Sequence, residues 1–403
     1  VGFAAMERVT DSTGHEEDVA RVLAYHERTK HHMHRYARSA GYMDWANQPD
    51  PFRAFEGAER VELPLRADAV TARYDELFTP GAVAPAAPDV ESVAAFFELA
   101  LGLTAWKEFG GSRWALRSDP SSGNLHPTEG YAVLPAASGL AAGVYHYLSR
   151  DHVLERRCGL APATARRLED LLGRDGFLVG LSSIHWREAW KYGERAFRYC
   201  QHDTGHVIGT VRFAAAALGW RARLVDGLGD ERVARLLGLD REEDFGTVDR
   251  ADREHPDAVL AVGPGVTPAS VAALESGAAE LVDDVARGEW NGRPNPLSPE
   301  HARWDVIDDV AQAARKPPGA GETQRAETFA SPLRLPCADH ASFLIRRRRS
   351  AVALDGRTSI PAERFFAMLD ALLPRPEVPP WDALPWEPSL HLGIFVHRVD
   401  DLS

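Results

Sequence analysis

Apolar residues recur at helical spacing in two segments of the chain, residues 89–100 and 196–218. In the first segment, Asp89 has the side chain of a helix N-cap, and apolar residues follow three and four positions apart. The second segment is longer and stops at Gly219, a residue suited to the position after the end of a helix. We expect two amphipathic helices that each bury one face. Further helices are expected over residues 230–237 and, leading into a basic His-rich stretch, over residues 18–38.

Short runs of β-branched and aromatic residues predict strands among these helices. The clearest runs are residues 131–134 and 144–148, which turn residues separate, so we expect neighbouring strands. Other extended segments are expected at residues 60–65, 223–225 and 258–262. Helices and strands are therefore mixed, but the order of the strands in a sheet does not follow from the pattern.

The pattern begins a second time after a polar segment rich in proline and glycine. We assign residues 313–336 to a linker. Beyond it, a helix opening at Ile360-Pro361 carries a Phe-Phe pair, as the helix after Asp89 does, and residues 390–396 stand where residues 131–134 stood. We predict a first unit with a helical leader at residues 1–312 and an incomplete second unit at residues 337–403. The chain is then expected to be a fragment of a longer tandem protein, or one whose remaining part was cleaved or is disordered.

Composition and charge narrow the class of partner. Acidic residues number 59 against 46 basic ones, a net charge of -13, and a nucleic acid partner would need a concentrated positive surface. We expect a small or polypeptide substrate. The three cysteines are far apart, which favours a reduced, cytoplasmic protein. We find no apolar stretch long enough to cross a membrane and no export signal in residues 1–8.

Residues 117–127, RSDPSSGNLHP, form the sharpest local motif. Two serines, a glycine and an asparagine stand between prolines just before a predicted strand. Such a loop offers hydroxyls, an amide and backbone N–H groups at close range. These groups suit the polar edge of a flavin ring better than a catalytic nucleophile, which would need an adjacent base. An ordinary polar turn is the alternative.

Two further motifs contain clustered basic residues. Residues 190–195, WKYGER, place a lysine beside a tyrosine ahead of the long predicted helix. A surface lysine beside a packed tyrosine would explain this pair without any chemistry. Residues 346–350, RRRRS, open the predicted second unit. A run of arginines is usually a solvated face, although guanidinium groups also suit a dianionic phosphate.

Taken together, the PSSGNLHP segment, the GVYHYL strand, the Lys-Tyr pair and the Arg-Arg-Ser turn resemble the SagB-type (azoline) dehydrogenases of the nitroreductase superfamily. The resemblance implies an α+β nitroreductase fold, with a central mostly antiparallel sheet flanked by helices, and two related units forming a pseudo-dimer. It implies FMN as cofactor, and it gives Lys191 and Tyr192 the role of assisting proton removal while hydride leaves for the flavin. The cofactor-binding residues that it implies are Arg117, Pro120, Ser121, Ser122, Gly123, Asn124, Arg348, Arg349 and Ser350.

The two units look complementary. The first has the PSSGN loop without a clear Arg-Arg-Ser turn, and the second has the turn without the loop. The flavin sites of this family lie across a dimer interface, so we expect one composite FMN site, with the ring edge at residues 121–124 and the phosphate at residues 348–350. Arg35 and Arg38 of the leader are a less favoured phosphate grip. A structure that separates the two segments would exclude the composite site.

For function, the resemblance implies an FMN-dependent oxidoreductase, a flavoprotein that oxidises an azoline heterocycle or related C–N bond in a peptide-derived substrate. The alternatives are an NAD(P)H-dependent nitro or quinone reductase and a non-catalytic flavin-fold scaffold subunit. We expect a pseudo-dimer within the chain or a homodimer. No metal is expected, because His202 and His206, although four residues apart, have no third ligand at suitable spacing.

Overall fold

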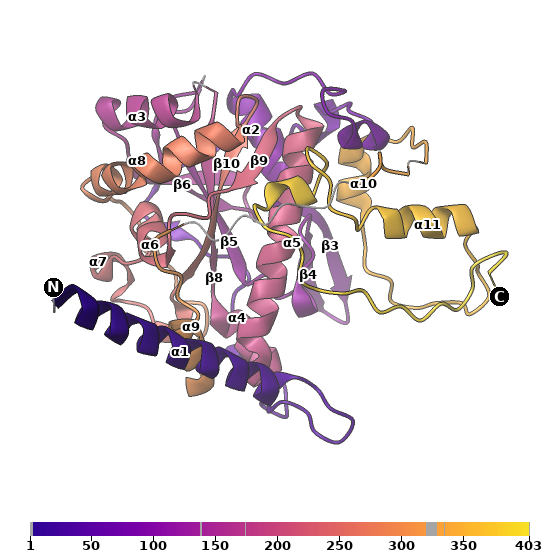
Figure 1. The fold of residues 1–403 in the computed structure, drawn as a ribbon, viewed down its shortest axis with the longest axis horizontal. Helices are drawn as coiled ribbons and strands as arrows, with labels where there is room; N and C mark the ends of the chain where they lie inside the picture. The colour runs from indigo at the N-terminus through magenta and orange to yellow at the C-terminus, as the bar shows by residue number, and fades with distance from the viewer. Residues whose placement is uncertain (1–2, 138, 174, 320–328, 334, 403) are drawn as a thin grey trace.

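The computed structural model describes residues 3–137, 139–173, 175–319, 329–333 and 335–402. Residues 320–328 and 334 of the predicted linker lie outside this described part. A seven-stranded sheet forms the centre, in the order β2-β7-β6-β5-β8-β10-β9, and every neighbouring pair is antiparallel (Figure 1). Its strands are β2 (Glu59–Glu62), β5 (Thr128–Leu134), β6 (Gly143–Leu148), β7 (Val153–Gly159), β8 (Phe177–Ser183), β9 (Arg221–Leu224) and β10 (His255–Gly263).

Two small antiparallel ladders accompany this sheet. One joins β1 (Phe55–Glu56) to β11 (Arg293–Pro294), and the other joins β3 (Leu103–Phe109) to β4 (Ser112–Arg117). Gly110 and Gly111 connect β3 to β4 with φ values of 58° and 82°. Two successive positive φ values are what a tight hairpin turn requires, and glycine adopts them without strain. The sequence pattern marked a break here but did not predict the hairpin.

Helices cover both faces of the large sheet. On one face α2 and α5 contribute to a core cluster with the strands, and on the other α3, α6 and α8 do so (Figure 1). The helices are α1 (Phe3–Thr29), α2 (Val90–Ala100), α3 (Pro162–Leu172), α4 (His185–Tyr192), α5 (Ala196–Ala217), α6 (Asp230–Leu237), α7 (Glu242–Phe245), α8 (Pro268–Ala286), α9 (Asp305–Ala313), α10 (Ala341–Arg347) and α11 (Ala362–Asp370). The predicted mixture of helices with a central antiparallel sheet is confirmed.

The two best-defined predicted helices form as expected. The carboxylate of Asp89 accepts a hydrogen bond of 2.9 Å from the backbone N–H of Ser92 and so caps α2. Helix α5 ends just before Gly219, which has a φ of 69°. The predicted pairing of residues 131–134 with 144–148 is the antiparallel pairing of β5 with β6. Local sequence signals therefore account for both the ends of these helices and this strand pair.

A buried ion network ties helix α4 to the sheet. His146 on β6 lies between two carboxylates, with 3.1 Å from Nε2 to Glu129 and 3.1 Å from Nδ1 to Glu155. Arg187 of α4 forms an ion pair with Glu129 and is fully buried. Since a buried charge is tolerated only where it is paired, this network holds α4 in one place against β5.

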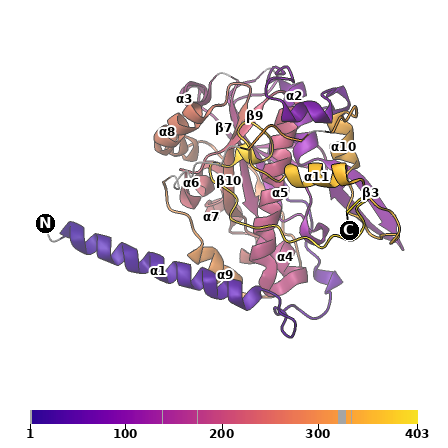
Figure 2. The ribbon, with the colours of Figure 1, turned by 45° about the vertical axis from the view of Figure 1, so that its right-hand side comes forward.

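Helix α1 extends away from the body of the molecule (Figure 2). Its C-terminal end is anchored on the turn after α4: the phenol of Tyr25 donates to the carbonyl of Glu194, and Arg28 forms an ion pair of 2.5 Å with the Glu194 carboxylate. The predicted exposed leader helix is therefore present, starting earlier than residue 18. Within the described part of the chain, no helix is long and apolar enough to span a membrane.

Residues 335–402 pack against the first unit. Ser342 of α10 donates to the carbonyl of Val70, and Asp382 forms a buried ion pair of 2.8 Å with Arg212 of α5. The helix predicted after Ile360-Pro361 is α11. Residues 390–396 form no strand and are exposed. The described structure therefore does not contain the strand that the comparison with residues 131–134 suggested at this position. The division into units at residues 313–336 stays a prediction.

Candidate functional site

The predicted flavin loop follows β4 and has a strained backbone. Gly123, Asn124 and His126 all have positive φ values, of 63°, 62° and 51°. Such values are uncommon for residues other than glycine, and they persist where surrounding contacts hold them. Asp203 of α5 supplies those contacts, because its carboxylate accepts from the backbone N–H of Ser122 at 2.9 Å and from the Ser122 hydroxyl at 2.9 Å.

The polar side chains of the loop are largely engaged within it. The Ser121 hydroxyl accepts from the backbone N–H of His126 at 2.8 Å. The amide of Asn124 donates to the carbonyl of Ala115 at 2.8 Å, and its oxygen lies 3.2 Å from Nε2 of His126. These bonds shape the loop, so the surface that it offers to a ligand is made mainly by its backbone.

Lys191 and Tyr192, at the end of α4, meet the tip of this loop. A Cβ atom placed on Gly123 would lie 2.5 Å from the phenol oxygen of Tyr192 and 2.9 Å from Nζ of Lys191. Two motifs almost seventy residues apart are thus brought into direct apposition. Burial raises the pKa of Tyr192 to about 12, and the acidic groups Glu188 and Asp203 add to this effect. The phenol is therefore protonated near neutral pH.

Two of the residues predicted to bind the cofactor lie at the base of the loop. Arg117 is buried, and its guanidinium donates a hydrogen bond of 2.5 Å to the carbonyl of Pro51. Burial lowers the pKa of this guanidinium. Its contacts are with the protein interior, so it supports the loop from behind. Pro120 stands between Arg117 and the turn η4 (Ser122–Asn124) and is half-buried.

The arginine run lies close to the start of the same loop. Arg348 follows α10, and Asp119, which precedes Pro120, is near enough to raise its pKa against the lowering effect of burial. Arg349 reaches the carbonyl of Thr104 on β3 at 3.5 Å. Arg348, Arg349 and Ser350 are all exposed. The two segments assigned to one composite site are therefore neighbours in the fold.

The leader arginines are engaged elsewhere. Arg35 donates to the carbonyl of Glu27, and the guanidinium of Arg38 lies 5.1 Å from the ring centre of Trp304. The carbonyl of Arg38 accepts from the backbone N–H of Glu194, and a Cβ atom on Gly193 would lie 2.6 Å from that carbonyl oxygen. The leader thus packs against the turn that follows Lys191 and Tyr192 and supports it. The guanidinium groups of Arg35 and Arg38 are engaged with Glu27 and Trp304.

Two buried acidic residues of this region, Asp203 and Glu188, were not predicted from the sequence to belong to the site. Asp203, to which no role was assigned from the sequence, organises the loop. Glu188 of α4 is fully buried, and neither carboxylate oxygen has a hydrogen-bond partner among the described residues. The signal for Glu188 was its spacing, since it precedes Lys191 and Tyr192 by three and four residues and shares their side of a helix.

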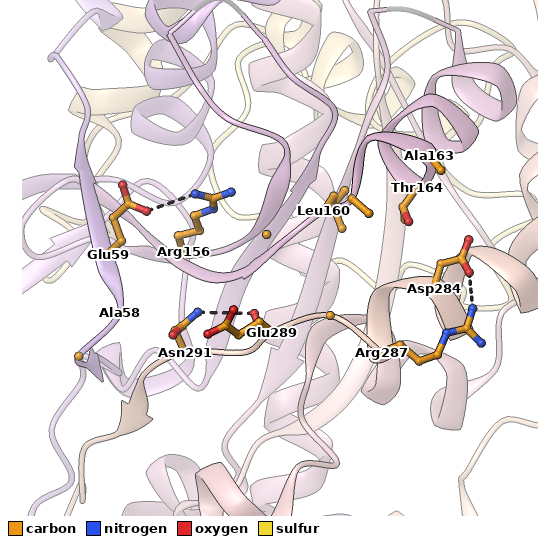
Figure 3. A pocket seen from close by; sticks show the side chains of 14 residues that line it. Ala58, Glu59, Arg156, Leu160, Ala163, Thr164, Asp284, Arg287, Glu289 and Asn291 are labelled. Carbon is orange, nitrogen blue, oxygen red and sulfur yellow. Dashed lines mark hydrogen bonds and ion pairs between the residues drawn. The ribbon is translucent and has the colours of Figure 1, made fainter.

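A cavity with several charged lining residues lies away from this loop. It measures about 990 Å³ and is lined by residues of β2, β7, α3 and the end of α8 (Figure 3). Its charged side chains pair with one another, as Glu59 does with Arg156 and Asp284 with Arg287. Such mutual pairing leaves few groups to recognise a ligand. Across the described ranges, no cluster of three or more metal-ligating side chains occurs, and His202 and His206 lie exposed on α5.

Comparisons with known proteins agree with this architecture. Residues 85–248 match the model of the nitroreductase family. A crystal structure from Anabaena variabilis, described as a nitroreductase, superposes with a TM-score of 0.56 at 20% identity, covering 87% of this chain and 67% of that one. The fold is therefore the nitroreductase fold, as predicted, and residues 85–248 are similar to the nitroreductase family.

Two relatives share part of the sequence. A protein of Methanocaldococcus jannaschii, described as a nitroreductase, is 27% identical over 124 residues, 30% of this chain and 63% of its own length. The trifolitoxin-processing protein TfxB of Rhizobium leguminosarum bv. trifolii is 34% identical over 131 residues, 30% of this chain and 35% of its own length. The matches thus span less than two thirds of either relative.

Proposed function

We propose that this protein is an FMN-dependent dehydrogenase that oxidises an azoline or related C–N bond in a peptide-derived substrate. The observation that carries the proposal is the apposition of Gly123 with the side chains of Lys191 and Tyr192. A loop tip without a side chain, facing an amine and a phenol, suits a flat cofactor edge beside groups that can move a proton.

The residues present fit FMN in shape and charge. Gly123 is exposed at the loop tip, and its missing side chain lets the phenol of Tyr192 and the amine of Lys191 lie directly against the loop backbone, so a ring edge bound at the loop would lie beside both groups. Arg348 and Arg349 are exposed at the other end of the region and would hold the dianionic phosphate, whose oxygens suit guanidinium forks. When bound, FMN supplies a hydride acceptor.

The protein's own part in the reaction is to hold the substrate and move a proton. Oxidation of a C–H bond beside nitrogen or sulfur needs a proton acceptor as well as a hydride acceptor. In our proposal the amine of Lys191 takes the proton at Nζ, and the phenol of Tyr192, protonated near neutral pH, donates a hydrogen bond that orients the substrate. The similarity to TfxB, a trifolitoxin-processing protein, favours a peptide-derived substrate.

The cofactor is tested first. The purified protein should be yellow, and the chromophore released by denaturation should have the mass of FMN. A colourless protein that takes up no added FMN would instead favour the non-catalytic scaffold. Turnover is then tested on a synthetic thiazoline peptide by the loss of two hydrogens in the mass spectrum. Lys191→Ala should abolish turnover while retaining FMN, and Lys107→Ala, an exposed lysine on the β3–β4 hairpin, serves as the matched control.

An NAD(P)H-dependent nitro or quinone reductase is the second candidate, favoured by the relatives described as nitroreductases. Reduction of a nitroarene by NAD(P)H at a rate above that of thiazoline oxidation, and independent of Lys191, would select it. The dehydrogenase proposal predicts the reverse ranking and a requirement for Lys191.

We further propose a second nitroreductase-like unit beginning at residues 337–403 and a pseudo-dimer or homodimer. In support, Gly205 and Gly209 lie on a face of α5 where a Cβ atom would meet nothing within 4 Å. A helix face of this kind allows close approach of another helix. Light scattering would decide between a monomer and a homodimer of this chain.

A cytoplasmic location is favoured by the three cysteines, none of which forms a disulfide: Cys158, Cys200 and Cys337.

A further inference from the structure

The carboxyl group of Glu188 is the least explained buried polar group near the candidate site. The residue is 0% exposed, and both of its side-chain oxygens lack hydrogen-bond partners among the described residues. Leaving a buried carboxylate without a partner costs free energy, so such groups are retained mostly where a function requires them. We therefore expect Glu188 to have a function that depends on its burial and on its lack of a hydrogen-bond partner in the part of the chain that the structure describes.

Position links Glu188 to the two residues proposed for proton transfer. On α4 it lies one turn before Lys191 and Tyr192, on the same side of the helix. Lys191 and Tyr192 reach forward to Gly123, while Glu188 stays behind them in the interior. A proton taken at the loop therefore has an acid–base group one helical turn away from the residue that receives it.

The charged surroundings of Glu188 favour its protonated form. Burial is the main cause that raises its pKa well above the usual value, and the negative charge of Asp203 on α5 acts in the same direction. Lys191 opposes them. Cys200 of α5 also faces this carboxyl and keeps its own proton, because burial and the neighbouring acids raise the thiol pKa. The phenol of Tyr192 is likewise protonated near neutral pH, so neither this phenol nor the Cys200 thiol can take up a proton there.

We propose that Glu188 is a buried proton store behind Lys191, a positioning residue that takes up the substrate proton while the substrate covers the site. This inference rests on the proposed dehydrogenase function. Two hydrogens leave the substrate: bound FMN would supply the acceptor for the hydride, and the other hydrogen leaves as a proton to the amine of Lys191. The electron pair that held this proton forms the new double bond of the product. The resulting ammonium gives a proton to the carboxylate of Glu188, which regenerates the amine.

The store matters because a bound substrate keeps water away from the amine. A proton on Lys191 then has no solvent path, and a carboxylate one helical turn away receives it at short range. After the product leaves, Lys191 is again half exposed and the proton returns through it to solvent. Dehydrogenation therefore needs the ionised form of Glu188, and kcat should rise with pH through the titration of this carboxyl group.

The test compares the pH profiles of Glu188→Gln, Glu188→Asp and Asp257→Asn in the FMN-loaded protein. Glu188→Gln keeps the shape of the side chain but cannot take up a proton, so we expect a loss of kcat of roughly tenfold or more, an unchanged KM and no rising limb. Glu188→Asp should restore a rising limb. Asp257 is the matched control: it is an acid bonded to the hydroxyls of Ser183 and Thr204, and burial raises its pKa to about 7, but it lies on β10. Asp257→Asn should keep the limb.

A second measurement does not depend on turnover. The difference between infrared spectra of the protein recorded at acid and at alkaline pH should contain the carbonyl band of a protonated carboxyl group that Glu188→Gln removes and Asp257→Asn leaves. If Glu188→Gln turns over the substrate with the same pH profile and the same carbonyl band as the unsubstituted protein, the role of Glu188 is overturned and the dehydrogenase function is not. Absence of thiazoline oxidation by the unsubstituted protein overturns the dehydrogenase function and this inference with it. If Glu188→Gln does not fold, a Glu188→Asp profile identical to that of the unsubstituted protein overturns the inference.

Discussion

Tyr192 closes on Gly123 so tightly that a single added methyl group at Gly123 would lie 2.5 Å from the phenol oxygen. The contact joins the loop after β4 to the end of α4, two elements that the sheet and the Arg187–Glu129 ion pair hold in place. The candidate site is therefore built from rigid parts, and small changes at this contact should have large effects.

The first prediction concerns that contact. Gly123→Ala adds a Cβ atom where there is no space and where the φ of 63° disfavours any side chain. We expect FMN binding to weaken by about tenfold or more, because the loop or Tyr192 must shift. Titration of the apoprotein with FMN measures this. Gly14→Ala, on the exposed helix α1 with nothing within 4 Å of the added Cβ atom, is the control and should bind FMN normally, with a stability equal or higher by up to about 1 kcal/mol.

The second prediction concerns the phosphate. Arg348→Ala should weaken FMN binding by about 10-fold to 100-fold, since a charge-assisted hydrogen bond is worth roughly 1.5–3 kcal/mol. Riboflavin, which lacks the phosphate, should bind the variant and the unsubstituted protein equally. Arg347→Ala is the control, because this guanidinium lies over the ring of Phe343. Equal FMN affinity in all three proteins would disprove the composite site.

The third prediction concerns the support of the loop. Asp203→Ala removes the acceptor of both Ser122 bonds and leaves a partly buried N–H group unpaired, which costs up to about 1–3 kcal/mol. We expect a lower free energy of unfolding in urea and weaker FMN binding together. Asp203→Asn retains one acceptor oxygen, so its free energy of unfolding and its FMN affinity should lie between those of Asp203→Ala and of the unsubstituted protein. A variant that loses stability but binds FMN with unchanged affinity would separate Asp203 from the site.

The fourth prediction concerns pH and stability. Burial opposes the charge on His146, but hydrogen bonds to Glu129 and Glu155 outweigh it and raise the His146 pKa from 6.5 to about 9. A raised histidine pKa stabilises the folded state fully below pH 6.5, and this contribution is lost as the pH rises through 9. The difference corresponds to about 3 kcal/mol. Urea unfolding should therefore show stability falling from pH 6.5 to 9, and His146→Gln, although less stable throughout, should lose this slope.

Local sequence signals were sufficient for several elements. The cap at Asp89, the end of α5 at Gly219 and the pairing of β5 with β6 depend on neighbouring residues, and the structure has them where expected. The hairpin at Gly110 and Gly111 was missed because a glycine pair marks a break without showing which strands meet across it.

The candidate site divides in the same way. Resemblance to a family identified the PSSGN loop, the Lys-Tyr pair and the arginine run as separate motifs. Their meeting at Gly123 and Asp119 came only from the fold, because it depends on how α4 and α10 pack against the loop. The side chains of Ser122 and Asn124 hold the loop itself, and no local pattern reveals such partners.

The sequence by itself determined that helices and strands are mixed, where the main helices lie and which residue types are available for chemistry, because helical spacing, caps and turns are local properties of a chain. The nitroreductase fold with its central antiparallel sheet was implied by the resemblance to a family. Tertiary structure alone decided that Arg117 supports the loop from inside, that Asp203 organises it and that Glu188 is buried without a partner behind Lys191. Burial and pairing are set by contacts between segments distant in sequence. Those contacts determine which of the polar groups are available to act.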